Sequence, residues 1–125
     1  MSEIKIHRSL HHSNIVGFEH FFEDAENVYK ELVETNTENG QVRNVYLDKI
    51  RLAQTYCWQD RDEESLVSLH EALDFFTREK DVFNIGRCEA GLTFCNVHLN
   101  RGFEAEKHAL IALDIFESSG DKLRL

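Results

Sequence analysis

The chain has 125 residues, of which 42% are hydrophobic and 30% charged, and it contains 6 glycines and no proline. This length suits one compact domain with a continuous apolar core, and the scarcity of turn residues favours long helices over a β-sandwich or barrel. The net charge of −9, from 14 Lys and Arg against 23 Asp and Glu, opposes binding to nucleic acid or to anionic membrane surfaces.

Residues 1–40 predict an irregular first repeat. A short helix is expected at residues 2–12, with a break at Ser13 or Asn14. A longer helix should follow, because apolar residues then recur at three- and four-residue steps. These residues are Phe18, Phe22, Ala25, Tyr29 and Leu32. Asn39-Gly40 should end that helix, since glycine tolerates the positive φ of a helix C-terminus.

Two pairs of helices are predicted next, each helix from a single apolar face. The pairs are 41–58 with 62–78, and 82–99 with 103–118. The acidic residues at 62–64 stand where the free N–H groups and dipole of a helix N-terminus favour carboxylates. Asp81 and Asp121 can each cap a helix that follows them. Because the connections are short, neighbouring helices should pack antiparallel.

A repeat of 40 residues relates these pairs. Ala72-Leu73-Asp74-Phe75-Phe76 aligns with Ala112-Leu113-Asp114-Ile115-Phe116, and Leu32-Val33-Glu34 lies one period upstream. We therefore expect one helical-repeat domain, divided into residues 1–40, 41–80 and 81–120. Residues 121–125 look like the opening of a further repeat, so the chain is expected to be the N-terminal part of a longer protein.

Two segments, Leu52-Ala53-Gln54-Thr55-Tyr56 and the stretch from Leu92 to Glu106, resemble tetratricopeptide repeats, and the resemblance covers roughly residues 42–125. It implies an all-α fold in which antiparallel helix pairs stack as a right-handed superhelix. The family's small packing residues would fall at Ala53, Ser65, Ala72, Thr93, Ala105 and Ala112. The chain departs from the family pattern in its period of 40 instead of 34, which is typical of long-helix variants. Lys49 and Glu89 replace the early tryptophan, and the closing proline is missing.

In tetratricopeptide arrays the first helix of each pair lines a concave groove, so the resemblance implies a non-catalytic module that binds a peptide or helix of another protein. The groove positions that carry over are Leu47, Gln54, Trp58, Arg87, Phe94 and His98, with Ile50, Cys57, Ala90 and Val97 beside them. Trp58 and Phe94 would be the anchors, unless they pack under the next repeat or at a helix end. Arg43 and Arg87 could bind an acidic peptide end.

Another hypothesis for this module is a sensory or regulatory domain at the N-terminus of a bacterial signalling protein. Its partner would then be an output domain of its own longer chain, such as a nucleotide cyclase, a kinase or a transcription regulator. An open end of the helix array would also allow self-association into a homo-oligomer.

A second resemblance lies near the start of the chain. The run Glu3-Ile4-Lys5-Ile6-His7-Arg8, with Asn14-Ile15-Val16-Gly17-Phe18 and Phe21-Phe22-Glu23-Asp24, resembles the regulatory helix and following strand of the polo-like kinase small lobe. The chain has no Gly-rich loop, strand lysine, His-Arg-Asp loop or Asp-Phe-Gly, so we expect no phosphate transfer. Since no nucleophile, base or phosphate-cradling motif stands out either, we predict that the protein is not an enzyme and needs no cofactor.

Metal binding is a third hypothesis, in the form of a small metal- or ligand-binding helical domain. One helical face of the N-terminal segment would present Glu3, His7 and His11. Cys95 and His98 lie one turn apart, but Cys95 shares an apolar stripe with Cys88, which favours a core position. We therefore predict no metal site. The three cysteines, at spacings unlike a disulfide framework, predict reduced thiols in a cytoplasmic protein.

Overall fold

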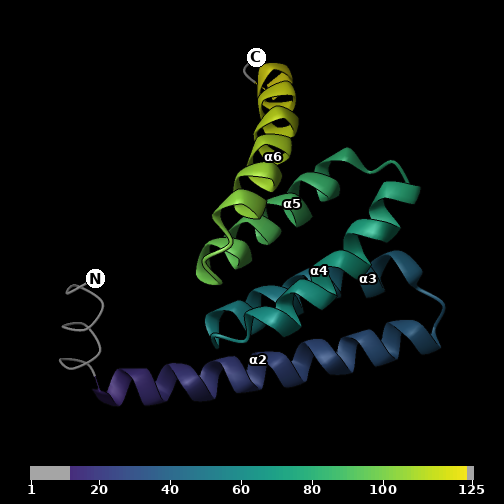
Figure 1. The fold of residues 1–125 in the computed structure, drawn as a ribbon. Coiled ribbons are helices and arrows are strands. Elements are labelled where there is room, and N and C mark those ends of the chain that lie inside the picture. The colour runs from purple at the N-terminus through teal and green to yellow at the C-terminus, as the bar shows by residue number, and fades with distance from the viewer. Residues whose placement is uncertain (1–11, 124–125) are drawn as a thin grey trace.

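The computed structural model describes residues 12–123, which form five α-helices and no strand. In chain order these are α2 (His12–Glu38), α3 (Val42–Trp58), α4 (Asp62–Arg78), α5 (Val82–His98) and α6 (Gly102–Leu123). The helices are stacked in the order of the chain (Figure 1). Within this part of the chain each helix contacts its neighbours in sequence, and α3 also contacts α5. The predicted all-α, repeat-like fold is confirmed.

Four turns of the same construction link the helices. The middle residue of each three-residue turn has a positive φ: Gly40 (71°), Asp60 (59°), Lys80 (56°) and Asn100 (59°). In the first turn the N–H of Gly40 donates to the carbonyl of Thr37 (3.2 Å), and the N–H of Gln41 donates to that of Asn36 (2.8 Å). The other three turns repeat both bonds, so each helix ends in a Schellman motif that satisfies its last carbonyls. The turns recur every 20 residues, which is half the predicted period.

The core lies between α3, α4 and α5 in two adjoining clusters. One contains Ala53, Leu66, Leu69, Leu92 and Cys95, and the other contains Ile50, Ala72, Phe76 and Cys88. Two glycines let α5 approach its neighbours closely. A Cβ atom on Gly91 would lie 2.9 Å from Leu69 Cδ2, and one on Gly86 would lie 2.9 Å from Ile115 Cγ2. Helix α5 is therefore held tightly between α4 and α6.

The small residues assigned to close packing occupy such positions in most cases. Five of the six are buried, namely Ala53, Ser65, Ala72, Ala105 and Ala112. Thr93 is only half-buried, and its hydroxyl donates to the Glu89 carbonyl of its own helix at 2.9 Å. Small side chains thus allow adjacent helices to approach, as the periodicity suggested.

Two predicted helix boundaries are wrong. Helix α2 runs through Ser13 and Asn14, so the break expected there does not exist. Helix α6 continues past Asp121 to Leu123, so this aspartate does not cap a new helix. A glycine inside a helix costs only about 1 kcal/mol relative to alanine, which does not oblige Gly120 to end α6. The helix predicted over residues 2–11 lies outside the described part of the chain.

Arg61 fixes α2 against the turn between α3 and α4. Its guanidinium donates to Glu26 of α2 at 2.5 Å and to Glu64 at 2.6 Å, and it lies 4.5 Å from the centre of the Tyr56 ring. Burial acts to raise the pKa of Glu26, but hydrogen bonds from Lys30 and Arg61 outweigh it and hold that pKa below its ordinary value. Helix α2 is thereby held beside the C-terminal end of α3.

None of the helices formed by residues 12–123 is both long enough and apolar enough to cross a lipid bilayer.

Candidate functional site

A groove of about 580 Å³ lies between α3 and α5, with α4 below it. Helix α3 contributes Ile50, Ala53, Gln54, Cys57 and Trp58 to its lining. Helix α5 contributes Arg87, Ala90, Gly91, Phe94, Cys95 and His98. Ser65 and Leu69 of α4 complete the floor. The groove follows from the stacking, because α3 and α5 are both neighbours of α4 and lie next to each other.

Five of the six predicted groove residues line this groove, namely Gln54, Trp58, Arg87, Phe94 and His98. Leu47 does not. It is half-buried and packs, with Ile85, against the core cluster that contains Ile50 and Phe76. At this level apolar side chains occupy the space between α3 and α5, so Leu47 belongs to the core.

The two predicted anchors are held in place but remain open to solvent. Trp58 is 69% exposed and Phe94 is 54% exposed. The Trp58 ring stacks on Phe22 of α2, with centroids 6.0 Å apart and planes 6° apart. Phe94 contacts the ring of His98 edge to face at 4.5 Å. Each aromatic ring is thus oriented by one neighbour while it still offers apolar area to the groove.

The two arginines proposed for acidic ligands differ in their surroundings. Arg43 donates to Asp81 at 2.6 Å, so its charge is already paired. Arg87 donates only to the side-chain oxygen of Asn84, at 3.2 Å, and forms no ion pair with any described carboxylate. Of these two cations, Arg87 is the one that lines the groove with its charge uncompensated.

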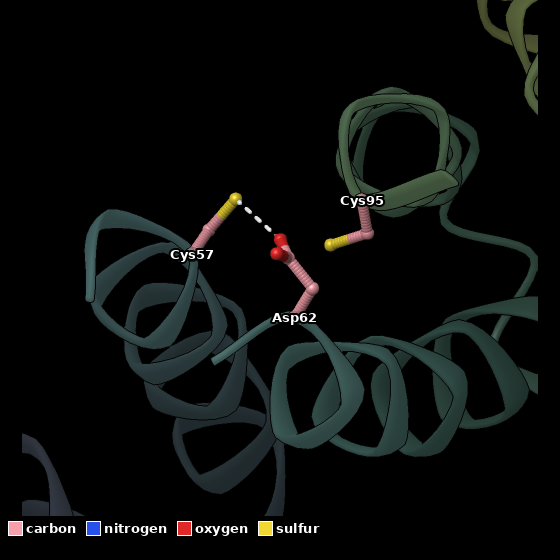
Figure 2. Close-up of side chains that lie close together, drawn as sticks. All are labelled: Cys57, Asp62 and Cys95. Carbon is pink, nitrogen blue, oxygen red and sulfur yellow. Dashed lines mark hydrogen bonds between the residues drawn. The ribbon is translucent and has the colours of Figure 1, made fainter. Parts of the chain in front are cut away.

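Two thiols, a carboxylate and an imidazole meet at one end of the groove. Cys57 comes from the last turn of α3, Asp62 from the start of α4 and Cys95 from α5, and their side chains point toward one another (Figure 2). Cys57 Sγ lies 3.5 Å from Asp62 Oδ1, and one ligand atom from each of the three residues lies within 4.8 Å of the others. His98 Nδ1 lies 3.2 Å from Asp62 Oδ1 and 3.8 Å from Cys57 Sγ. We call these four residues the thiol cluster.

The thiols of the cluster differ from the third cysteine in their acidity. Hydrogen bonding with the Cys57 sulfur lowers the pKa of Cys95 to about 7, despite the burial of this thiol. The same contact, together with burial and the Asp62 carboxylate, raises the pKa of Cys57 above its usual range. Burial raises the pKa of Cys88 to about 12. The pair in the cluster therefore shares a proton and carries thiolate character that Cys88 lacks.

The meeting of these four groups was not predicted from the sequence. Asp62 was predicted only as a carboxylate at a helix N-terminus, which it is, and Cys57 only as a groove position. A usable signal was present: two residues that flank a tight turn between antiparallel helices lie close together, as Cys57 and Asp62 do around Asp60. Their proximity to Cys95 and His98 depends on the packing of α5, which the spacing alone did not reveal.

Comparison with known proteins finds similarity over a short stretch only. Twenty-nine residues, 23% of the chain, are 79% identical to a probable serine/threonine-protein kinase CCRP1 of Zea mays, and 28 residues are 75% identical to a probable serine/threonine-protein kinase PLK of Dictyostelium discoideum. Twenty-seven residues are 59% identical to the serine/threonine-protein kinase PLK2 of Mus musculus. The matches span 5%, 3% and 4% of the lengths of these kinases. The resemblance to polo-like kinases is thus confirmed for this stretch alone.

No protein-family model matches the chain, and no solved structure matches it. The resemblance to tetratricopeptide repeats stays a prediction, while the all-helical, consecutively packed architecture stands on the structure itself.

Proposed function

We propose that the chain is a non-catalytic interaction module whose groove binds a peptide or helix of another protein. The observation that carries this proposal is the pair of large aromatic side chains, Trp58 and Phe94, which line one groove while more than half exposed. Buried aromatic anchors supply much of the binding energy of protein interfaces, and concave sites exclude water around them. The close packing of α5 against α4 and α6 would keep such a site rigid, which limits the entropy lost on binding.

The lining residues indicate the chemistry of the ligand. An apolar side chain of the partner would fit between Trp58 and Phe94, beside the small residues Ala53 and Ala90. Arg87 would bind an acidic side chain or a C-terminal carboxylate, because its charge has no carboxylate partner among the described residues. The proposed ligand is therefore an apolar peptide that carries an acidic group. Its source would be another protein or, in a regulatory domain, a distant segment of a longer chain.

Trp58 provides a direct test, because it is the only tryptophan of the chain and lines the groove. Peptides would be selected from a displayed library with the purified protein, and binding would be followed by the emission of Trp58. We expect selected peptides to shift that emission to shorter wavelength as water leaves the ring. Phe94→Ala should weaken their affinity by about tenfold or more.

Phe103→Ala is the matched control, since Phe103 is 85% exposed and does not line the groove. It should leave the affinity unchanged. Arg87→Ala should weaken binding of acidic peptides and leave neutral variants of the same peptides unaffected. Selected peptides that bind wild type, Phe94→Ala and Arg87→Ala equally well would show that the groove is not the binding surface.

A further inference from the structure

We propose that Cys57, Asp62, Cys95 and His98 form a zinc-binding site at the end of the groove. The site would join α3, α4 and α5, from which its ligands come (Figure 2). The inference is independent of peptide binding, because it depends only on the thiol cluster. It goes beyond the prediction from the sequence, which placed Cys95 in the core and expected no metal.

The chemical types of the four donors suit zinc. Two thiolate sulfurs, one imidazole nitrogen and one carboxylate oxygen make a set of four, which is the number that structural zinc sites use. Sulfur donors disfavour magnesium and calcium, which prefer oxygen ligands only. The His98 donor would be Nδ1, the atom that faces Asp62 and Cys57. Either ring nitrogen of a neutral histidine can ligate a metal.

The spacing of the donors also fits a tetrahedral zinc ion. With metal–ligand distances of about 2.0–2.3 Å, the edges of a tetrahedral site measure about 3.4–3.8 Å. Cys57 Sγ and Asp62 Oδ1 are 3.5 Å apart, Cys57 Sγ and His98 Nδ1 are 3.8 Å apart, and Asp62 Oδ1 and His98 Nδ1 are 3.2 Å apart. One face of the tetrahedron is therefore already formed to within a few tenths of an ångström.

Cys95 would supply the fourth ligand after a small adjustment. Its sulfur lies within 4.8 Å of the donor atoms of Cys57 and Asp62 and donates at present to the Ser65 hydroxyl at 3.3 Å. A modest movement of this side chain would bring the sulfur to the ion. The Ser65 hydroxyl, which donates to the Ala53 carbonyl at 2.8 Å, would keep its place beside the bound sulfur.

The charges around Asp62 give an independent reason for a cation. The side chain of Asp62 is only 10% exposed, yet its described partners are a thiol and a histidine ring, with no lysine or arginine among them. By contrast, the buried carboxylate of Glu26 pairs with Arg61 and Lys30. A buried carboxylate is expensive to maintain without a compensating positive charge. A divalent cation would provide that charge and would stabilise both thiolates.

The proton balance of binding is simple. Each thiol that ligates the ion releases its proton to solvent, the carboxylate binds in its ionised form, and the imidazole binds in its neutral form. A Zn²⁺ ion with two thiolates and one carboxylate carries a net charge of −1 at the site. A disulfide between Cys57 and Cys95 would use only two of the four groups, whereas a metal ion uses them all.

The test uses the full chain, reduced and stripped of metal with a chelator, and then titrated with Zn²⁺ or Co²⁺ alone. We expect one ion bound per chain. Cobalt should give the intense visible absorption of a tetrahedral site together with a thiolate-to-cobalt charge-transfer band. Zinc should raise the thermal unfolding temperature in a concentration-dependent way, because it binds the folded state selectively.

Variants identify the ligands. Cys57→Ala and Asp62→Asn should each weaken zinc affinity by at least about tenfold, and His98→Ala should do the same. Cys57 is only half-buried and Asn is close in shape to Asp, so both variants should fold, which far-ultraviolet circular dichroism would check. Cys88→Ala and His70→Ala are the matched controls, since neither residue belongs to the cluster, and they should leave the affinity unchanged.

The N-terminal histidines supply the competing explanation of any metal binding. A His7→Ala, His11→Ala double variant should bind zinc as tightly as wild type. The proposal is overturned if this variant loses binding, if Cys57→Ala retains it, or if cobalt gives a six-coordinate spectrum without a charge-transfer band. A chain that binds selected peptides but no zinc would refute this inference and leave the proposed function standing.

Discussion

At the scale of single residues, Arg61 makes the densest set of polar contacts in the part of the chain considered above. It bonds to Glu26, Gln59 and Glu64 and lies over the Tyr56 ring. Because it follows the positive-φ residue Asp60, the turn geometry directs its side chain back toward α2. One side chain thus joins α2, the α3–α4 turn and α4.

Replacement of Arg61 by alanine should destabilise the fold by about 2 kcal/mol, because it removes the main partner of the buried Glu26 carboxylate. The free energy of unfolding would be measured by urea denaturation. Arg101→Ala is the control, since Arg101 pairs with the exposed Glu63 and should contribute less than about 1 kcal/mol. Equal losses in the two variants would contradict the role assigned to Arg61.

Glu26 should also make stability depend on pH. Its pKa is lowered in the folded state, so its contribution is complete above the pKa of the unfolded chain and is lost as the pH falls through the lower folded value. The free energy of unfolding of wild type should therefore decrease in acid below about pH 4.5. Glu26→Gln should be less stable at neutral pH and show a smaller decrease in acid. An unchanged acid slope in Glu26→Gln would argue against the ion pair.

At the scale of elements, the positive-φ turns determine where each helix ends. Gly40→Ala should destabilise the protein by about 1 kcal/mol, because a Cβ atom disfavours the left-handed conformation at φ 71°. No steric contact complicates the comparison, since no heavy atom lies within 4 Å of the added Cβ. Gly102→Ala meets the same open space at the start of α6 without a positive φ. It should leave the midpoint of denaturation unchanged or higher.

The helices could be predicted closely from the sequence, but their repeat unit could not. Apolar periodicity placed α3 and α4 within a residue of their observed bounds. Only one of the four turns has glycine at its positive-φ position, and Asp60, Lys80 and Asn100 give weak signals of that conformation. The 20-residue spacing of the turns was therefore missed. Gly120 looked like a further turn, yet α6 passes through it because its backbone bonds continue.

The groove could also be predicted in large part, because helical register alone places Trp58, Phe94 and His98 on facing surfaces. What register could not supply was depth: Leu47 shares the stripe of Gln54 but lies where core side chains fill the gap. Nor could it bring Asp62 to Cys95, since that contact depends on how α4 and α5 pack together. Local context is equally decisive for Asn14 to Asp24, where the kinase resemblance implied a strand and the structure has a helix.

At the scale of the whole molecule, stability should be concentrated in α3, α4 and α5, where both core clusters lie. Leu92→Ala should cost about 3 kcal/mol, because Leu92 is fully buried at the centre of one cluster. Leu113→Ala, at a half-exposed position on α6, should cost less than about 1 kcal/mol. Urea denaturation of both variants would measure the difference. Similar losses would mean that the terminal helix is as integral to the fold as the centre.

The 20-residue turn spacing has a consequence for how such a chain could grow. One helix with its turn reverses the chain direction, so the gain of a single unit would move the growing terminus to the opposite side of the array. The gain of two units would restore the direction and place a new helix next to α5 or α3 on the same surface. Duplications that lengthen the groove must therefore come in multiples of two units, about 40 residues, although the geometric module is half that size.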